Sequence, residues 1–380
     1  MQMRRAFTLL ELCVVILIAV ILFALLSISL SDTRGPSRRT QCSHNLRNLS
    51  LAAIQYENTH RQFPGYLMNF GTFPGSVDPS NPDASPKSLQ PHRKIGTVSV
   101  ALLPWLDAQP TYEHWTEDRY PIVYFDGVSQ TASKNGFVEL AAPNLAIFQC
   151  PQDSNIHWKV GRNSYISNNG MHHQSPSGLD SWTLTRSDGT ATEVNFARSM
   201  EIANGVFNNQ FAGLDPDGVP MPIGPQIGME DFKDGQGNTV LFSESLQALP
   251  WQQAGFVDAE ALRVDETAAE IRYPRKARFG QGMVWHYEDS DQINGAGTVS
   301  PVHRINGGSP LSTKMTPLNA ADIARPSSAH TDGVNMSMGD GSTRFITETI
   351  DYRVYQALMT PRGKSSLVPK EDYVLDADAL

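Results

Sequence analysis

Ala6-Phe7-Thr8-Leu9-Leu10-Glu11 begins an apolar segment that continues to Leu30, and two arginines precede it. Between positions 12 and 26 every side chain is apolar except for the thiol of Cys13. At a rise of about 1.5 Å per residue, a helix over residues 7–30 is long enough to cross a hydrocarbon core of roughly 30 Å. The segment therefore predicts a transmembrane helix over residues 7–30.

The charges beside this segment predict its orientation. Arg4 and Arg5 precede it and no charge follows it directly, so we expect a single-pass protein of the cell inner membrane. The N-terminus would be cytoplasmic and the body periplasmic or extracellular. An uncleaved signal anchor and a secretory signal cleaved near Ser27-Ile28-Ser29 are the alternatives. Neither accounts for Glu11, since a carboxylate in an apolar helix is unfavourable unless it is paired.

The same hexapeptide resembles the cleavage and methylation signature of type IV prepilins and type II secretion pseudopilins. The resemblance implies a leader over residues 1–6, cleavage by a prepilin peptidase between Ala6 and Phe7, and N-methylation of Phe7. It also implies that Glu11 pairs with the α-amine of a neighbouring subunit during assembly. Ala6 departs from the family, which usually has glycine before the cleavage site.

The rest of the chain predicts a folded body. Apolar residues make up 40% of the sequence, and 29 glycines and 25 prolines indicate many turns. We therefore expect an exterior α+β domain over residues 61–380, built on an antiparallel sheet. The net charge of −9 argues against nucleic acid as a partner.

A second helix is expected between the apolar segment and the body. Apolar residues recur at helical spacing over residues 38–59, and Gly35-Pro36 predicts a break before them. This pattern predicts a kinked amphipathic stalk helix over residues 31–60. Short strands are expected at 146–153, 164–170, 194–196, 205–207, 239–242, 283–285, 334–338 and 343–346.

Two of the three cysteines follow the apolar segment, where the chain is expected to meet an oxidising environment. We predict that Cys42 and Cys150 form a disulfide that joins the stalk helix to the body. Two free thiols are the alternative.

The C-terminal region carries a second resemblance. His330 is followed after nine residues by Asp340-Gly341, and this spacing is similar to that of a large family of pseudopilin-like proteins with a prepilin N-terminus, of the general secretion pseudopilin G type. The resemblance implies no enzymatic activity.

Two interpretations of this motif compete. In the first, residues 334–338 and 343–346 form a hairpin whose turn is Asp340-Gly341, and the His330 ring bonds backbone carbonyls or Asp340. In the second, His330, Asp332 and Asp340 form a metal or acid–base cluster. No second histidine lies close in sequence, so the hairpin is favoured.

Other candidate sites are weaker. Asp215-Pro216-Asp217-Gly218 begins like a calcium loop but lacks its later ligands, so calcium is an alternative to our expectation of no metal and no cofactor. His172-His173 lies among glycine and serine and is predicted to be solvated rather than liganding. The sequence has neither a Gly-x-Ser-x-Gly elbow nor a glycine-rich phosphate loop followed by lysine. We therefore expect no catalytic residue.

These features predict a membrane-anchored, pseudopilin-like structural subunit, possibly at the tip, of a type II secretion or type IV pilus-like assembly. Its expected partners are a prepilin peptidase, other pseudopilins or pilins, and the membrane. A membrane-tethered extracytoplasmic enzyme or carbohydrate-binding module with a prepilin-type signal is the alternative.

Overall fold

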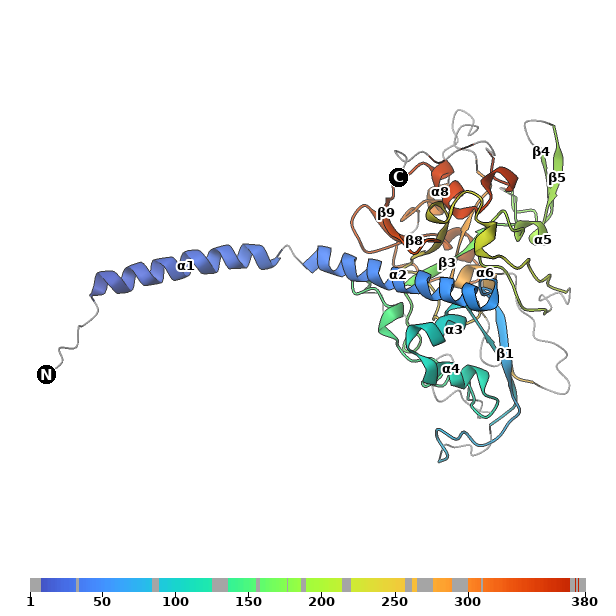
Figure 1. Cartoon of the computed structure of the whole chain (residues 1–380), viewed down its shortest axis with the longest axis horizontal. Coiled ribbons are helices and arrows are strands. Elements are labelled where there is room, and N and C mark those ends of the chain that lie inside the picture. The colour runs from blue at the N-terminus through green and yellow to red at the C-terminus, as the bar shows by residue number, and fades with distance from the viewer. Residues whose placement is uncertain are drawn as a thin grey trace.

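A computed structural model gives the fold of the chain (Figure 1). It describes residues 8–31, 34–83, 89–124, 136–154, 158–175, 177–185, 189–213, 220–256, 262–264, 276–288, 300–308, 310–369, 373 and 375, with side chains for all of these except residues 24–34.

Two long helices precede a body in which the other helices are short. The α-helices are α1 (Leu9–Ser31), α2 (Arg34–His60), α3 (Val98–Leu102), α4 (Gln109–Thr116), α5 (Phe196–Ser199), α6 (Ala277–Gly280), α7 (Ala320–Ile323) and α8 (Tyr352–Met359). The 3-10 helices include η1 (Leu103–Leu106), η2 (Ala146–Phe148), η3 (Met229–Asp231), η4 (Gln236–Asn238), η6 (Pro301–His303) and η7 (Gly363–Ser365).

The body is built on a five-stranded sheet with the strand order β7-β3-β6-β8-β9. Its strands are β3 (Tyr165–Met171), β6 (Val240–Glu244), β7 (Gly282–Trp285), β8 (Gly333–Met338) and β9 (Thr343–Thr347). Two small antiparallel pairs lie outside it, namely β1 (Met68–Phe73) with β2 (His92–Gly96) and β4 (Trp182–Thr185) with β5 (Ala191–Val194).

Helices pack on the two faces of this sheet. The buried face of α2 includes Leu46, Leu49 and Ala53 and contributes to the larger hydrophobic core. Val334 and Met336 of β8 belong to a second core with α8. Because successive strand residues point to opposite faces, α2, which also contacts β8, covers the other side. This packing places the start of the C-terminal motif beside the stalk helix.

The predicted transmembrane helix is wrong. Among the residues that the structure describes, no helix is long and apolar enough to cross a membrane. The fold class is therefore corrected to a mixed α+β body with sheets. The same finding contradicts the predicted single-pass placement in the inner membrane.

Three further expectations need correction. The sheet is mixed rather than antiparallel, since β7 runs parallel to β3. No break separates Gly35-Pro36 from residues 38–59, because both lie within α2 (Arg34–His60); a proline is tolerated in the first helical turn. Residues 146–153 contain η2 instead of a strand. The carbonyl of Gln149, which follows η2, accepts a hydrogen bond of 3.0 Å from Nδ2 of Asn45 in α2.

Most of the other strands were predicted at the right places. Residues 164–170, 239–242, 283–285, 334–338 and 343–346 correspond to β3, β6, β7, β8 and β9. Residues 205–207 form no strand, and residues 194–196 are divided between the end of β5 and the start of α5.

Candidate functional site

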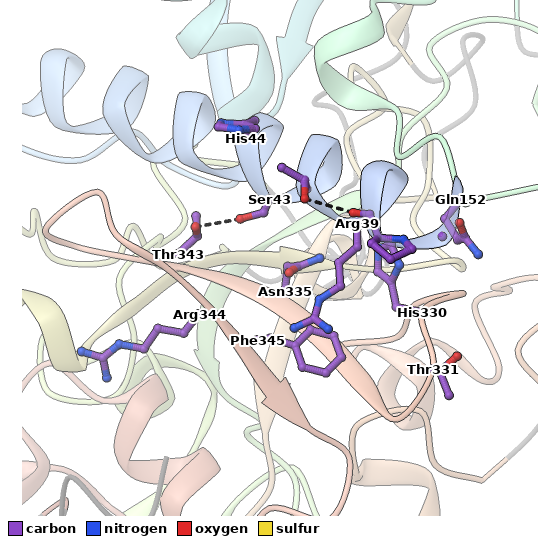
Figure 2. A pocket seen from close by; sticks show the side chains of 13 residues that line it. Arg39, Ser43, His44, Gln152, His330, Thr331, Asn335, Thr343, Arg344 and Phe345 are labelled. Carbon is purple, nitrogen blue, oxygen red and sulfur yellow. Dashed lines mark hydrogen bonds between the residues drawn. The ribbon is translucent and has the colours of Figure 1, made fainter. Parts of the chain in front are cut away.

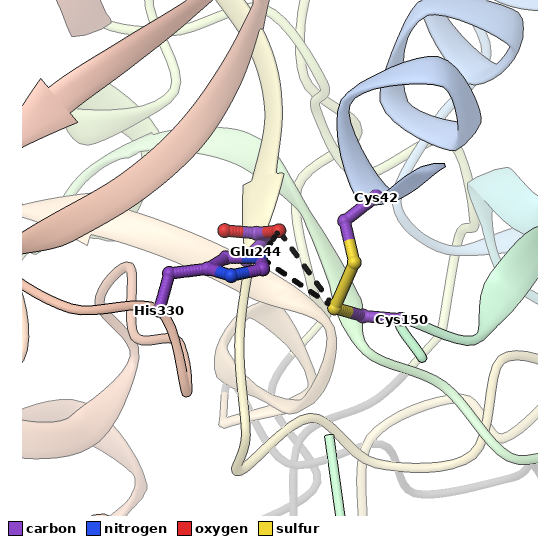
Figure 3. A group of neighbouring side chains, drawn as sticks. All are labelled: Cys42, Cys150, Glu244 and His330. Atoms are coloured by element: carbon purple, nitrogen blue, oxygen red, sulfur yellow. Dashed lines mark hydrogen bonds and ion pairs between the residues drawn. A yellow bond between two sulfur atoms is a disulfide. The ribbon is translucent and has the colours of Figure 1, made fainter. Parts of the chain in front are cut away.

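His330 lies three residues before the start of β8 and is bonded to a carboxylate from a neighbouring strand. Its Nε2 atom is 3.0 Å from Oε1 of Glu244, the last residue of β6 (Figure 3). The two side chains are only 4% and 2% exposed. Since a carboxylate oxygen accepts, the imidazole donates this hydrogen bond from Nε2.

The Glu244 carboxylate is surrounded by donors. Oε1 also accepts from Nδ2 of Asn335 at 2.9 Å, and Oε2 accepts from the Asn335 backbone N–H at 2.8 Å. A buried carboxylate is tolerated only when its oxygens are hydrogen-bonded or paired in this way. The carboxylate therefore ties together the end of β6, the middle of β8 and the residue that begins the C-terminal motif.

A disulfide between Cys42 and Cys150 confirms the predicted pairing. It connects α2 to the loop after η2, with 5.0 Å between the two Cα atoms. The Sγ atom of Cys150 lies 3.7 Å from Nε2 of His330 and 4.0 Å from Oε1 of Glu244. The predicted disulfide and the predicted motif therefore meet at one place (Figure 3).

These four residues resemble a metal-binding set in their composition. The two sulfurs, the imidazole nitrogen and the carboxylate oxygen all lie within 4.8 Å of one another. Zinc and similar ions bind the thiolate form of cysteine, however, and both sulfurs are here bonded to each other. The cluster in its oxidised form is therefore a structural junction.

A solvent-accessible groove of about 600 Å³ begins at His330 and runs between α2 and the β8–β9 hairpin (Figure 2). Its walls include Arg39, Ser43 and His44 of α2. The Arg39 guanidinium lies 3.4 Å from the centre of the Phe345 ring, and the hydroxyls of Ser43 and Thr343 are 2.8 Å apart. These contacts fasten the first half of α2 to β9.

The predicted hairpin is confirmed, but the predicted partner of His330 is wrong. β8 pairs antiparallel with β9, and Oδ1 of Asp340 accepts from the Ser342 N–H at 2.8 Å in the turn. Burial raises the pKa of the Asp340 carboxyl, but hydrogen bonds from Ser342 and the charge of Arg344 outweigh it and lower the pKa. Gly341 has a φ of 80°, a conformation that glycine adopts without strain.

His330 and Asp340 therefore lie at opposite ends of β8, and their side chains bind different partners. Asp332, the third member of the alternative cluster, has a φ of 66° in the turn that leads into β8. The structure does not bring these three side chains together as a metal or acid–base cluster.

Glu11 has a partner within its own helix. Its carboxylate accepts from the backbone N–H of Thr8 at 2.9 Å, and the Thr8 hydroxyl lies 3.3 Å from the Glu11 N–H. This reciprocal pair is a capping box at the start of α1. These bonds lower the pKa of the Glu11 carboxyl. Ala6 and Phe7, the predicted cleavage site, lie outside the described residues.

The remaining candidates have different outcomes. Four residues of the predicted calcium loop, Asp215-Pro216-Asp217-Gly218, lie outside the described residues. His172 and His173 are 5% and 4% exposed, so the expectation that they are solvated is wrong. β3 ends at Met171, and both histidines follow it into the core, where the His172 ring packs 5.3 Å from that of Phe279.

Sequence reasoning did not identify Glu244. The signal was a carboxylate two positions after the apolar stretch Val240-Leu241-Phe242, because a strand that is buried throughout places Glu244 inside the body.

Comparisons with known proteins give one family. A family model, SBP_bac_10, described as "Protein of unknown function (DUF1559)", matches residues 32–353. No curated protein and no solved structure matches the chain.

Proposed function

The chain belongs to the DUF1559 family, which is associated with pilin-like proteins that carry a prepilin signal, and we propose that it is a structural subunit of a type II secretion or type IV pilus-like assembly. Its body would be displayed by the assembly, and its N-terminal helix would join it to neighbouring subunits.

The observation that carries this proposal is the apolar surface of α1. Figure 1 shows this helix extending away from the body. Its large apolar side chains from Leu9 to Phe23 are 49–81% exposed. Soluble proteins rarely leave so large an apolar surface uncovered, and a helix that is apolar on all sides is normally buried. No described residue of the same chain covers it, which supports cover by helices of other subunits.

Glu11 supports the same proposal. Its side chain is exposed at the first turn of α1, and the bonds from Thr8 favour its ionised form. In a bundle of apolar helices an ionised carboxylate needs a positive partner. The α-amine of a neighbouring subunit, freed by a prepilin peptidase before Phe7, would supply this charge. A subunit in the wrong register would leave both charges unpaired.

The large size of the body is better suited to display at the tip of an assembly than to a subunit of the repeating shaft of a filament. A shaft subunit needs a small body, whereas the matched family region alone spans residues 32–353. The Cys42–Cys150 disulfide is typical of proteins that work in an oxidising compartment. We therefore propose a minor or tip position.

We propose no enzymatic role. In the groove beside α2, Nε2 of His330 is bonded to Glu244, and the Glu244 oxygens are occupied by Asn335. A general base or nucleophile needs such atoms free to reach a substrate.

A matched pair of substitutions in the full chain tests the proposal. Leu17→Asp places a charge on α1, and Leu318→Asp places the same charge on a side chain of the body that is 92% exposed. We expect wild type and Leu318→Asp to form large assemblies in sedimentation and electron microscopy, and Leu17→Asp to remain dispersed. Equal assembly of the two variants would contradict the proposal.

A further inference from the structure

The disulfide, Glu244 and His330 form one buried group of side chains (Figure 3). Nε2 of His330 lies 3.7 Å from Sγ of Cys150 and 3.0 Å from Oε1 of Glu244, and the latter two atoms are 4.0 Å apart. Sγ of Cys42 lies within 4.8 Å of each of the other three atoms. We call Cys42, Cys150, Glu244 and His330 the junction cluster.

The spacing of these atoms suits a tetrahedral metal ion. Zn²⁺ binds thiolate sulfur at roughly 2.3 Å and imidazole nitrogen or carboxylate oxygen at roughly 2.0 to 2.2 Å. In a tetrahedral site with these bond lengths, the ligand atoms are roughly 3.4 to 3.8 Å from one another. The distances among Cys150, Glu244 and His330 are close to these values. The two sulfurs can take such positions only after the bond between them is broken.

Reduction converts the disulfide of the junction cluster into two thiols. With a phosphine as the reductant, the phosphine supplies two electrons and becomes a phosphine oxide, and water supplies its oxygen and the two protons on sulfur. A newly made chain has the same two thiols before it is oxidised. Zn²⁺ then displaces both thiol protons, because the thiolate is the form that binds the ion. The His330 proton moves from Nε2 to Nδ1, which frees the lone pair of Nε2 for the ion.

The surroundings of the junction cluster also suit an ion. Asn335 donates to both oxygens of Glu244, and it can keep these bonds while the ion replaces His330 as the partner of Oε1. Partners of this kind orient the ligands of a metal. The charges of two thiolates balance that of Zn²⁺, so the buried cluster keeps only the charge of Glu244. His330 also lines the groove beside α2, which gives an ion a path from solvent.

We propose that the reduced junction cluster binds one Zn²⁺ ion through Cys42, Cys150, Glu244 and His330. The ion joins α2 to the loop after η2, as the disulfide does in the oxidised chain, and it also holds the end of β6 and the segment before β8. The junction therefore has two forms, a disulfide in the oxidised chain and a zinc site in the reduced chain. Binding needs no second subunit, so it is independent of the proposed assembly.

Zn²⁺ binding by the full chain with Cys13→Ser tests this site, because Cys42 and Cys150 are then its remaining cysteines. The chain is purified both with a phosphine and in the oxidised form, and competition with a chromophoric chelator measures the affinity of each. We expect one tight site per reduced chain, and binding to the oxidised chain that is weaker by roughly tenfold or more. Zn²⁺ should raise the thermal unfolding midpoint of the reduced chain and leave that of the oxidised chain unchanged. If reduction unfolds the chain, Zn²⁺ should restore the native circular dichroism.

Two variants and a Co²⁺ spectrum identify the ligands. In the reduced chain, His330→Gln should weaken Zn²⁺ binding by roughly tenfold or more, because it removes a ligand. His44→Gln, at an exposed position of α2, is the control and should bind like its parent. Co²⁺ should give a thiolate charge-transfer band together with the ligand-field bands of a tetrahedral site. Equal Zn²⁺ affinity of the reduced and oxidised chains, equal affinity of His330→Gln and His44→Gln, or a Co²⁺ spectrum without the thiolate band would overturn the proposal.

Discussion

His330 donates a hydrogen bond of 3.0 Å to Glu244, which lies 86 positions earlier in the chain. The pair is buried and contacts the Cys42–Cys150 disulfide. The histidine of the C-terminal motif therefore has a structural reason for its position: it closes the junction between α2, β6 and β8.

Removal of the His330 ring tests this role. His330→Ala takes one donor from a buried carboxylate, which costs about 3 kcal/mol of unfolding free energy. His330→Gln keeps an amide donor and should lose clearly less. Urea denaturation of the two variants measures the difference. Equal losses would mean that the hydrogen bond to Glu244 contributes little.

The disulfide should contribute more than any single hydrogen bond. It closes a loop with a sequence separation of 108, so the Cys42→Ser/Cys150→Ser variant is expected to lose about 4 to 5 kcal/mol in the chain-entropy model. In native wild type a thiol reagent should label one of the three cysteines, Cys13, and all three after reduction and unfolding. Three labelled thiols before reduction would refute the pairing.

Acid should destabilise the body through His92. Its Nε2 accepts from the Ile122 N–H at 3.0 Å, and burial, aided by Lys94, lowers its pKa from 6.5 to about 4. Between these two values the unfolded chain binds a proton that the folded chain excludes. The contribution of neutral His92 to the free energy of unfolding is therefore fully present above pH 6.5. It is lost as the pH falls toward 4, and the loss amounts to about 3 kcal/mol.

Denaturation at several pH values checks this contribution. His92→Gln should be less stable than wild type at pH 7 but should lose less further stability on acidification. The exposed His60 provides the control, and His60→Gln should follow the wild-type curve. Identical pH dependence of wild type and His92→Gln would exclude His92 as a source of the acid sensitivity.

Processing at the N-terminus is a separate prediction. Co-expression with a prepilin peptidase should give a mature chain that begins with N-methylated Phe7, as mass spectrometry would detect. The Thr8–Glu11 capping box would survive this cleavage. An intact Met1, or a chain that starts after Ser29, would contradict the prepilin interpretation.

Local patterns in the sequence predicted much of the fold. Helical spacing from Cys42 to Tyr56 located α2, and Asp340-Gly341 located the β8–β9 turn, because both features are decided by neighbouring residues. The Cys42–Cys150 pairing followed from the cysteine count and the expected compartment.

Long-range contacts could not be predicted in the same way. The partner of His330 is a single carboxylate at the end of a different strand, and no periodic pattern in the sequence predicts this pairing. The His172 ring packs against Phe279 and His286, which are more than a hundred residues away in the chain. The parallel pairing of β3 with β7 is equally remote in sequence.

Cross-linking through Cys13 tests the central claim most directly. This thiol is exposed on α1, the helix proposed to pack against α1 of neighbouring subunits. A bifunctional maleimide added to the assembled wild-type chain should give covalent dimers, and Cys13→Ser and Leu17→Asp should give none. Only monomers from the assembled wild type, or equal dimer yields from wild type and Leu17→Asp, would contradict assembly through this helix.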